Sequence, residues 1–176
     1  MKHCDDFVVV ENQSLGSAFF KLSLQTCSPL PEITAGQFVE VRVPQTEGII
    51  LRRPISIHDV DYDTKTIILL IRIAGKGTKQ LSMLKKGECV NLIYPLGNGF
   101  DCKGDDVLLI GGGVGVAPLL FLAKSFHLKG IRPNILLGYR DKEQFLDLPE
   151  FNRYGEVFIA TQDGSLGEKA MVTEHS

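Results

Sequence analysis

The first hundred residues alternate between short apolar runs and turn residues. Six runs rich in Val, Ile and Phe are separated by Gly, Pro, Asn and Asp, at residues 7–15, 18–26, 36–44, 48–60, 64–75 and 88–97. Short strands with regular turn signals are typical of an antiparallel barrel or sandwich. We predict an antiparallel β-barrel of Greek-key type. It should carry one short helix after Gly77, capped by Thr78 and ended by Lys85, Lys86 and Gly87.

The pattern changes near residues 101–105. Apolar strands are expected at Val107–Ile110, Asn134–Leu137 and Val157–Ala160, with helical stretches over residues 116–130 and over residues 141–155, the latter broken by Pro149. Alternation of strands and helices predicts a parallel sheet with crossover helices. We therefore predict two domains, a barrel over residues 1–102 and a partial α/β nucleotide-binding domain over residues 103–176.

The α/β part is expected to be incomplete. In the usual doubly wound order the first strand is central, and later strands are added on its other side. Those later strands do not follow here, so the first strand should lie at an edge. An exposed apolar edge invites pairing with another chain. We expect self-association, disorder after about Thr161, or both.

Composition narrows the function. The formal net charge of -2 gives no electrostatic footprint for nucleic acid. No apolar run reaches the ~18 residues of a membrane span, and the first residues lack a signal-peptide layout, which favours a cytoplasmic location. The cysteines are too dispersed for a local zinc or iron–sulfur site and are expected to be buried free thiols: Cys4, Cys27, Cys89 and Cys102.

The stretch "RPIS" interrupts an apolar run at residues 49–57 with polar chemistry. The Arg53 guanidinium matches the geometry of phosphate oxygens. Pro54 removes a ladder donor, which suggests an edge or a cofactor-facing strand. Ser56 offers a hydroxyl suited to the edge of a flavin ring. The plainer alternative is a surface ion pair for Arg53 and a solvated Ser56.

Two glycine-rich loops follow strands. In "AGKGT", Gly77 and Thr78 come just before the expected helix, where backbone N–H groups could meet a phosphate. An ordinary strand–helix turn is the alternative. In "LLIGGGVGVAP" a buried strand runs into a phosphate-cradling type of turn at Gly111, Gly112, Gly113 and Gly115. The register departs from G-x-G-x-x-G, and close helix–sheet packing alone is the alternative.

The order of these features resembles the ferredoxin–NADP reductase superfamily, with a flavin-holding barrel followed by a nicotinamide-binding domain. Within it the chain resembles the electron-transfer subunits of dihydroorotate dehydrogenase B. The resemblance runs along nearly the whole chain, through "LRRPISI", "GKGTKQLS", "PLGNGF", "GGGVGVAPL", "GYRDKEQF" and "ATQDGSLGEKAMVT".

That resemblance implies FAD in the barrel and NAD(H) at the glycine loop of the second domain. It assigns FAD to two strands and one loop: Arg53, Pro54, Ile55, Ser56, Leu70, Ile71, Arg72, Gly77 and Thr78. It also implies electrons passing from NADH through FAD and a [2Fe–2S] cluster to a catalytic dihydroorotate dehydrogenase subunit in pyrimidine synthesis. Cofactors supply this chemistry, so no catalytic side chain is predicted.

The chain departs from the family pattern in three places. Ile55 stands where the superfamily has an aromatic residue, so stacking on the flavin should be weaker or come from elsewhere. Tyr94 stands where glycine is expected before "PLGNGF", which should alter the loop near the flavin. The family continues past Val172 and Thr173 into a cysteine-rich cluster segment. We therefore expect no [2Fe–2S] cluster and slow flavin reduction by NADH, in a fragment or a naturally short chain.

Two other functions fit the same motifs. One is a stand-alone NAD(P)H-dependent flavin reductase or ferredoxin-reductase-like protein, or a related hydrogenase or sulfide-reductase subunit. The other is a non-catalytic flavin-binding fragment. A cluster assay separates the subunit from the stand-alone reductase, and reduction of bound flavin by NADH separates both from the non-catalytic fragment.

Overall fold

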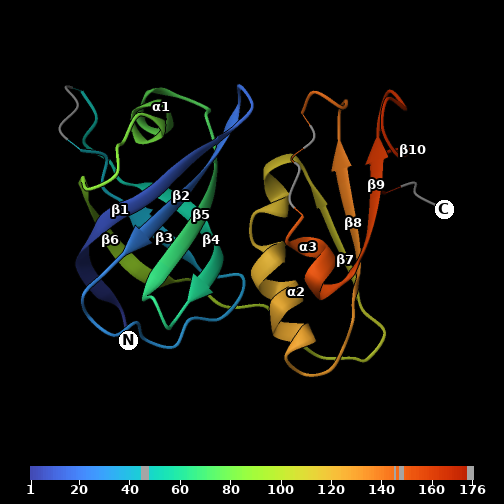
Figure 1. Cartoon of the computed structure of the whole chain (residues 1–176), viewed down its shortest axis with the longest axis horizontal. Coiled ribbons are helices and arrows are strands. Elements are labelled where there is room, and N and C mark those ends of the chain that lie inside the picture. Colours follow the sequence, from blue (N-terminus) through green and yellow to red (C-terminus); the bar gives the residue numbers. More distant parts are fainter. Residues whose placement is uncertain (45–47, 145, 147–148, 174–176) are drawn as a thin grey trace. The chain divides into compact units, whose positions relative to one another are not determined.

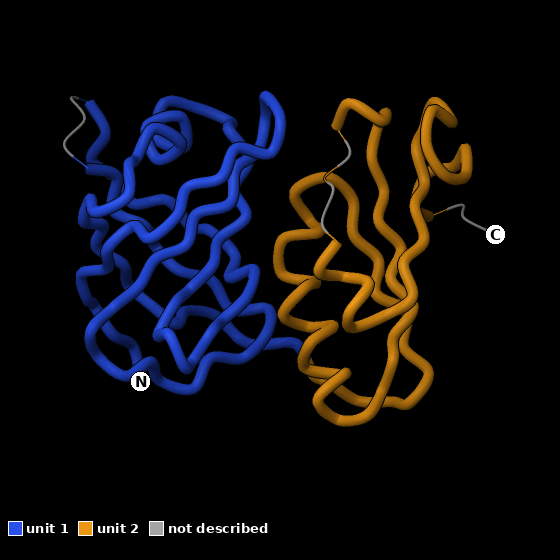
Figure 2. The backbone as a smooth tube through the Cα atoms, viewed as in Figure 1, with its two compact units in different colours: residues 1–100 blue, residues 101–176 orange. Residues whose placement is uncertain are grey.

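The chain divides into two compact units, Met1–Phe100 and Asp101–Ser176 (Figure 2). The structure is a computed structural model that describes residues 1–44, 48–144, 146 and 149–173. No helix within these residues is long and apolar enough to cross a membrane.

The first unit is a closed barrel of six antiparallel strands (Figure 1). Its strands are β1 (His3–Leu15), β2 (Phe19–Gln25), β3 (Phe38–Val41), β4 (Arg53–Asp61), β5 (Thr66–Arg72) and β6 (Cys89–Leu96). They follow the order β1-β2-β5-β4-β3-β6, and non-consecutive neighbours such as β2 and β5 require Greek-key crossovers. The predicted antiparallel barrel is confirmed.

Alternation along the strands fills the barrel. Phe7 and Val9 of β1 are fully buried, while Val8 between them is 40% exposed. The same inward set continues around the barrel with Leu22, Leu24, Val39, Val41, Ile57, Ile67, Leu69, Val90 and Leu92. Because the sheet closes on itself, these apolar side chains are all buried in one core inside the barrel. Closure also removes the exposed edges of an open sheet.

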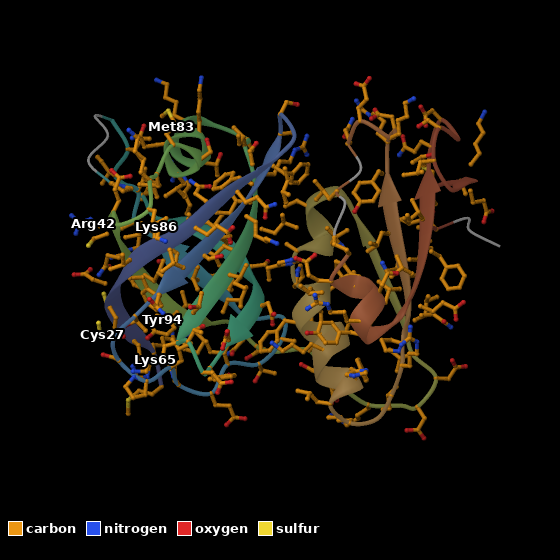
Figure 3. All side chains as sticks on the ribbon, viewed as in Figure 1. Cys27, Arg42, Lys65, Met83, Lys86 and Tyr94 are labelled. Atoms are coloured by element: carbon orange, nitrogen blue, oxygen red, sulfur yellow. The ribbon has the colours of Figure 1, made fainter. Side chains whose placement is uncertain are left out.

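Tyr94 belongs to this core and not to a surface loop. Its ring is fully buried and meets Phe7 edge-on, with ring centroids 5.1 Å apart (Figure 3). Its hydroxyl donates a 2.9 Å hydrogen bond to Asp5 of β1. Burial, and then the hydrogen bond and charge of Asp5, raise the pKa of the Tyr94 hydroxyl above its ordinary value. The residue that replaces the expected glycine therefore ties β6 to β1.

The fourth strand starts later than its apolar pattern predicts. β4 begins at Arg53, and Ile50 and Leu51 are 95% and 74% exposed. The residue before the strand is used as a clasp, since the Arg52 guanidinium donates to the carbonyl of Glu40 on β3 and to the carbonyl and side chain of Asn91 on β6. Apolarity alone therefore misplaced the strand's first residues.

The single helix of the barrel unit, α1 (Lys76–Ser82), lies across one end of the barrel (Figure 1). Its N-cap is Gly75, so the expectation that Thr78 caps it is wrong. Thr78 occupies the third helical position and turns back, its hydroxyl accepting from the N–H groups of Ala74 at 2.9 Å and Gly75 at 3.2 Å. The hydroxyl serves the orphan donors from inside the first turn.

The second unit is a parallel sheet. Its strands are β7 (Leu108–Gly112), β8 (Asn134–Tyr139), β9 (Glu156–Thr161) and β10 (Glu168–Lys169), in the order β10-β9-β8-β7. The three predicted strands are confirmed, and the first of them, β7, lies at an edge as expected. The short strand β10 was not predicted. With its preceding turn it continues regular structure from Thr161 to Lys169, where disorder was one of the two expected outcomes beside self-association.

The helices of this unit are shorter than the pattern predicts. A 3-10 turn, η1 (Gly113–Val116), leads into α2 (Leu119–His127), and the second helical stretch is reduced to α3 (Phe151–Tyr154). Residues 141–144 form a turn, while residues 145 and 147–148 of that predicted helix lie outside the described residues. Pro149 removes a helix donor at this point, which fits a late start for α3.

The two faces of the parallel sheet differ. Leu109, Ile135 and Leu137 are buried on the face that carries the helices. On the opposite face Leu108 is 58%, Ile110 48% and Phe158 37% exposed. Together with Asn134, Leu136, Val172 and Thr173, these three side chains line a hollow of about 410 Å³.

The cysteines contradict the expectation of buried thiols. Cys4, Cys27 (Figure 3) and Cys89 are exposed and Cys102 is partly exposed, and none of the four forms a disulfide. Cys4 and Cys89 stand at outward positions of β1 and β6, because each strand of a barrel turns every second side chain to solvent.

Candidate functional site

The barrel wall opens between β4 and β5. The two strands pair from Asp61↔Thr66 up to Ile57↔Leu69 and then diverge. Beyond that point Arg53–Ser56 pair with β3, and Leu70–Arg72 pair with β2. Among the described residues no ladder pair joins these two segments. Each segment therefore turns one row of backbone N–H and C=O groups toward the other, without a strand partner there.

The two predicted flavin segments are these two divergent strand ends. Sequence reasoning placed FAD at Arg53–Ser56 and at Leu70–Arg72, and both flank the same opening. Fully buried Leu70 and Ile71 leave only their backbone groups to offer a ligand, whereas the side chain of Arg72 is exposed. The opening, referred to below as the β4–β5 gap, offers polar backbone on both sides.

Side chains along β4 reach the gap from two faces. Arg53 is paired with Val41 and Ile55 with Val39, both fully buried, so Arg53 and Ile55 stand on the inward face. Ser56 is paired with Phe38 and stands on the outward face. An extended ligand lying along the open edge could meet Arg53 from one face and Ser56 from the other.

The two predicted phosphate motifs meet in space. Nε of Arg53 lies so close to Gly77 of α1 that a Cβ placed on Gly77 would be 2.5 Å away from it. Nη1 of Arg53 donates to the carbonyls of Leu51 at 3.0 Å and Arg52 at 3.2 Å. The guanidinium is thus held at one end of the β4–β5 gap, between the start of β4 and the first turn of α1.

The residues present fit a flavin dinucleotide. A pyrophosphate needs a cation with fork geometry, and Arg53, seated against the buried glycine Gly77, supplies it at one end of the gap. The flavin ring needs hydrogen-bonding groups at its edge, and the gap offers Ser56 with unpaired backbone along both strands. Among the described residues, Arg53 donates its hydrogen bonds to backbone carbonyls, and the surface ion pair considered for it is not seen there.

The glycines after β7 divide into two kinds. A Cβ on Gly111 would lie 2.6 Å from Leu119 and 3.2 Å from the carbonyl of Gly115, so Gly111 allows close helix–sheet packing. Gly113 has a φ of +54° and makes the turn, and a Cβ on Gly113 or Gly115 would meet no atom within 4 Å. Gly113 and Gly115 therefore have open space beside them, while the packing alternative describes Gly111.

Gly112 is partly covered by the chain's own last described residues. Val172 lies 3.9 Å from the Cβ position of Gly112, and its Cγ1 leaves no room for a Cβ on Gly138. Gly112 and Gly138 are paired across β7 and β8, so the two glycines form one notch that Val172 fills. Sequence reasoning missed this contact, because no local pattern links "LLGYR" to "AMVT".

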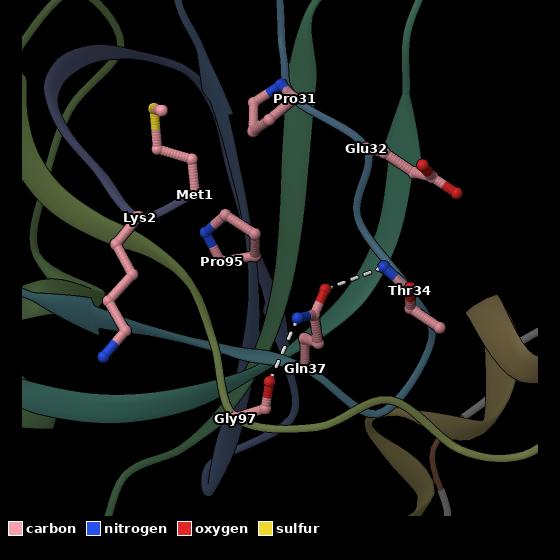
Figure 4. Close-up of a pocket in the computed structure, with 8 residues that line it drawn as sticks. All are labelled: Met1, Lys2, Pro31, Glu32, Thr34, Gln37, Pro95 and Gly97. Atoms are coloured by element: carbon pink, nitrogen blue, oxygen red, sulfur yellow. Dashed lines mark hydrogen bonds between the residues drawn. The ribbon is translucent and has the colours of Figure 1, made fainter.

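A further cavity of about 600 Å³ lies on the barrel unit (Figure 4). Gln37 joins two loops beside it, accepting from Thr34 N at 2.8 Å and donating to Gly97 O at 3.1 Å. None of the sequence-predicted site residues lines it. Its lining is Met1, Lys2, Pro31, Glu32, Thr34, Gln37, Pro95 and Gly97. We assign it no ligand.

Within the part of the chain that the structure describes, no group of three or more His, Cys, Asp or Glu side chains could hold a metal ion. Of the histidines, His58 is fully buried in β4, and His175 lies outside the described residues. The prediction about a [2Fe–2S] cluster therefore stays a prediction.

Comparison with known proteins decides the family. No family model matches the chain. The dihydroorotate dehydrogenase B (NAD(+)) electron transfer subunit of Fusobacterium nucleatum is 37% identical over 174 residues, which cover 97% of this chain and 67% of that protein. Its counterpart from Streptococcus pneumoniae is 40% identical over 94% of this chain and 67% of that protein. The chain belongs to the family of dihydroorotate dehydrogenase B electron transfer subunits.

It spans about two thirds of the length of the curated relatives it matches, such as the Bacillus cereus subunit, of which it covers 69%.

Solved structures agree with this family. A structure of NADH-dependent reduced ferredoxin-NADP oxidoreductase, a flavin-based electron-bifurcating enzyme, matches with a TM-score of 0.84 at 29% identity, over 96% of this chain and 60% of that chain. Phthalate dioxygenase reductase shares the fold, with a TM-score of 0.76 at 18% identity over 98% of this chain and 54% of that chain. This chain, with its closed antiparallel barrel and its parallel sheet, thus has the fold of these two reductases.

Proposed function

We propose that the chain is an FAD-carrying electron transfer subunit that passes electrons between NAD(H) and a catalytic dihydroorotate dehydrogenase subunit. The observation that carries this proposal is the β4–β5 gap, with Arg53 seated at its end against Gly77. The family supports the electron-transfer role, and the gap supports the barrel as the flavin site. A cytoplasmic location is part of the same proposal.

In this proposal each side of the gap has a task. Arg53, seated against Gly77, would hold the pyrophosphate by charge, with Thr78 beside it at the first turn of α1. Pro54, Ile55 and Ser56 would hold the flavin from β4, and the backbones of Leu70 and Ile71 with Arg72 would hold it from β5. FAD supplies the hydride and single-electron chemistry that no side chain here offers.

The second unit would receive the nicotinamide dinucleotide at the carboxyl end of β7. Gly113 and Gly115 face open space there and would lie closest to its phosphates. Gly111 and Gly112 would have structural roles next to the turn. Gly111 allows close packing of Leu119, and Gly112 lies beside Val172. This division refines the four glycines that the sequence singled out together.

A flavin assay on the purified chain tests the proposal. The protein should be yellow and release FAD on denaturation, and NADH should bleach the flavin absorbance slowly. Co-purification with a catalytic dihydroorotate dehydrogenase subunit would test the partner. A colourless chain with no affinity for added FAD would overturn the flavin assignment, and stoichiometric iron would overturn the expectation that this chain holds no cluster.

The ferredoxin-reductase-like alternative has one observation in its favour. The solved structure at 29% identity belongs to an NADH-dependent reduced ferredoxin-NADP oxidoreductase. Electron transfer from the reduced flavin to free ferredoxin, compared with transfer to the dihydroorotate dehydrogenase subunit, separates the two functions. Faster transfer to ferredoxin would favour the alternative.

A further inference from the structure

We propose that Gly77 acts as a positioning residue for Arg53. Its missing side chain gives the guanidinium a seat against α1, and its influence on cofactor binding is exercised through Arg53, not through direct admission of a phosphate to the backbone. The inference rests on the proposed function. The packing of the Arg53 guanidinium against Gly77 does not depend on a bound ligand.

The contact is too tight for any other residue. A Cβ on Gly77 would lie 2.5 Å from Nε of Arg53 and 3.2 Å from both Cζ and Nη2. Carbon and nitrogen atoms that are not bonded do not approach to 2.5 Å, because their attraction is greatest at about 3.5–4.0 Å. Either the guanidinium or α1 must move when Gly77 gains a side chain.

Helix α1 is poorly placed to move, since it is tied at both ends. At its start, the Thr78 hydroxyl accepts from Ala74 N and Gly75 N. At its end, the Asn12 amide of β1 donates to three carbonyls, those of Leu81 and Ser82 at 3.3 Å and that of Leu84 at 2.8 Å. Leu81 is also fully buried. The flexible partner is therefore the arginine side chain.

Displacement of Arg53 would also cost its internal bonds. Nη1 now donates to the carbonyls of Leu51 and Arg52. The guanidinium is planar and moves as one unit, so pushing Nε away from α1 also shifts Nη1 and Nη2. The fork would then no longer stand at the end of the β4–β5 gap in its present orientation.

The same loop contains a matched control. A Cβ on Gly75 would meet no atom within 4 Å, and Gly75 has an extended φ of -176° that any residue adopts. The φ of Gly77 is likewise outside the left-handed region. Alanine therefore suits the local backbone at both positions, and the two substitutions differ in whether the new methyl group meets Arg53.

A double-mutant cycle on FAD affinity is the first test, using Gly77→Ala, Arg53→Ala and the double variant. Losing a charge-assisted contact should weaken FAD binding about 10-fold or more in each single variant. In the Arg53→Ala background the further effect of Gly77→Ala should be within about twofold, because coupled residues are not additive. Gly75→Ala should stay within about twofold of wild type. Equal, additive losses from Gly77→Ala in both backgrounds would overturn the inference and favour direct phosphate approach.

Thermal unfolding of the flavin-free protein gives the second cycle. Gly77→Ala should lower Tm in the wild-type background and leave it unchanged or raise it in the Arg53→Ala background, where alanine is the better helix former and the clash is gone. The same drop in both backgrounds would contradict the packing claim. If wild type binds no FAD, the proposed function fails while this thermal cycle still decides whether Gly77 seats Arg53.

Discussion

The barrel and the parallel sheet offer their candidate sites in opposite ways. In the barrel unit the strands form a closed ring, and the site is a local departure from that ring, where β4 and β5 separate after Ile57 and Leu69. In the sheet unit β7 is an edge strand, and one face leaves Leu108 and Ile110 about half exposed. The glycine loop stands at the end of that open edge.

The two candidate sites therefore differ in their side chains: one has a positioned arginine, and the other offers backbone alone. The β4–β5 gap has α1 at one end, with Arg53 held by carbonyls and by Gly77. The glycine loop has open space beside Gly113 and Gly115, and its own residues 111–116 carry no charged side chain. We therefore expect this chain to hold a flavin better than a nicotinamide dinucleotide.

The largest effect should come from the covered face of the parallel sheet. Leu109 is buried beneath the helices and Leu108, its neighbour on β7, is 58% exposed on the other face. Leu109→Ala should lower the free energy of unfolding by about 2–5 kcal/mol, through lost burial and the cavity left behind. Leu108→Ala should change it by no more than about 0.5 kcal/mol. Chemical denaturation compares the pair, and equal losses would show that both faces are covered.

Arg53→Ala should produce the next largest effect, on binding. Removing the guanidinium should cost about 1.5–3 kcal/mol of FAD binding free energy, because a charge-assisted contact to phosphate is lost. Fluorescence titration of the flavin-free protein measures this. Circular dichroism on the same samples should show an intact barrel. Undiminished affinity in a folded variant would remove Arg53 from the site.

Tyr94→Phe should have a moderate effect that depends on pH. Loss of the hydrogen bond to Asp5 should cost about 1 kcal/mol of stability at neutral pH. The pKa of the Tyr94 hydroxyl is raised in the folded protein, so the neutral hydroxyl contributes stability that is complete below the unfolded pKa of about 10 and is lost as pH rises above it. Unfolding free energy should therefore fall less steeply above about pH 10 in the variant than in wild type. Parallel slopes would contradict the burial of this hydroxyl.

Tyr139 of β8 provides the counterpart in the sheet unit. Burial raises the pKa of its hydroxyl, and a hydrogen bond with the backbone of Leu146 partly offsets this. Tyr139→Phe should likewise flatten the alkaline fall in stability. Measuring both variants shows which unit limits stability at high pH.

A substitution on the exposed face of the parallel sheet should have the smallest effect on stability. It should nevertheless change self-association. Ile110→Lys places a charge where the side chain is 48% exposed, so the free energy of unfolding should change by no more than about 0.5 kcal/mol. If β7 and its open face mediate self-association, the lysine should shift the chain toward monomer. Light scattering over a concentration series measures this. A wild-type chain that is monomeric throughout would show that the open face does not drive association.

The local sequence pattern was sufficient to predict the six barrel strands, because alternation and turn residues are local signals. The edge position of β7 followed from general rules of sheet topology. It failed where a distant partner decides. The start of β4 depends on the Arg52 clasp to β3 and β6, and the N-cap of α1 depends on the Thr78 hydroxyl turning back. Burial of free cysteine is only a tendency, and strand phase placed Cys4 and Cys89 outward.

The candidate site shows the same division. The motifs "RPIS" and "GKGT" identified Arg53 and Gly77 separately, but their contact joins residues that are 24 positions apart, and no local pattern predicts it. The gap itself depends on where two strands stop pairing, which is a property of the closed barrel. The four glycines after β7 read alike in sequence, and only their neighbours, such as Leu119 and Val172, separate packing from access.

The most direct test of the central claim is a comparison of FAD, FMN and riboflavin in equilibrium titrations of the flavin-free protein. If the β4–β5 gap holds the flavin and Arg53 holds the pyrophosphate, FAD should bind most tightly and riboflavin, which has no phosphate, should bind at least about 10-fold more weakly. Arg53→Ala should reduce that preference for FAD. Equal affinity for FAD and riboflavin, unchanged in Arg53→Ala, would contradict the account.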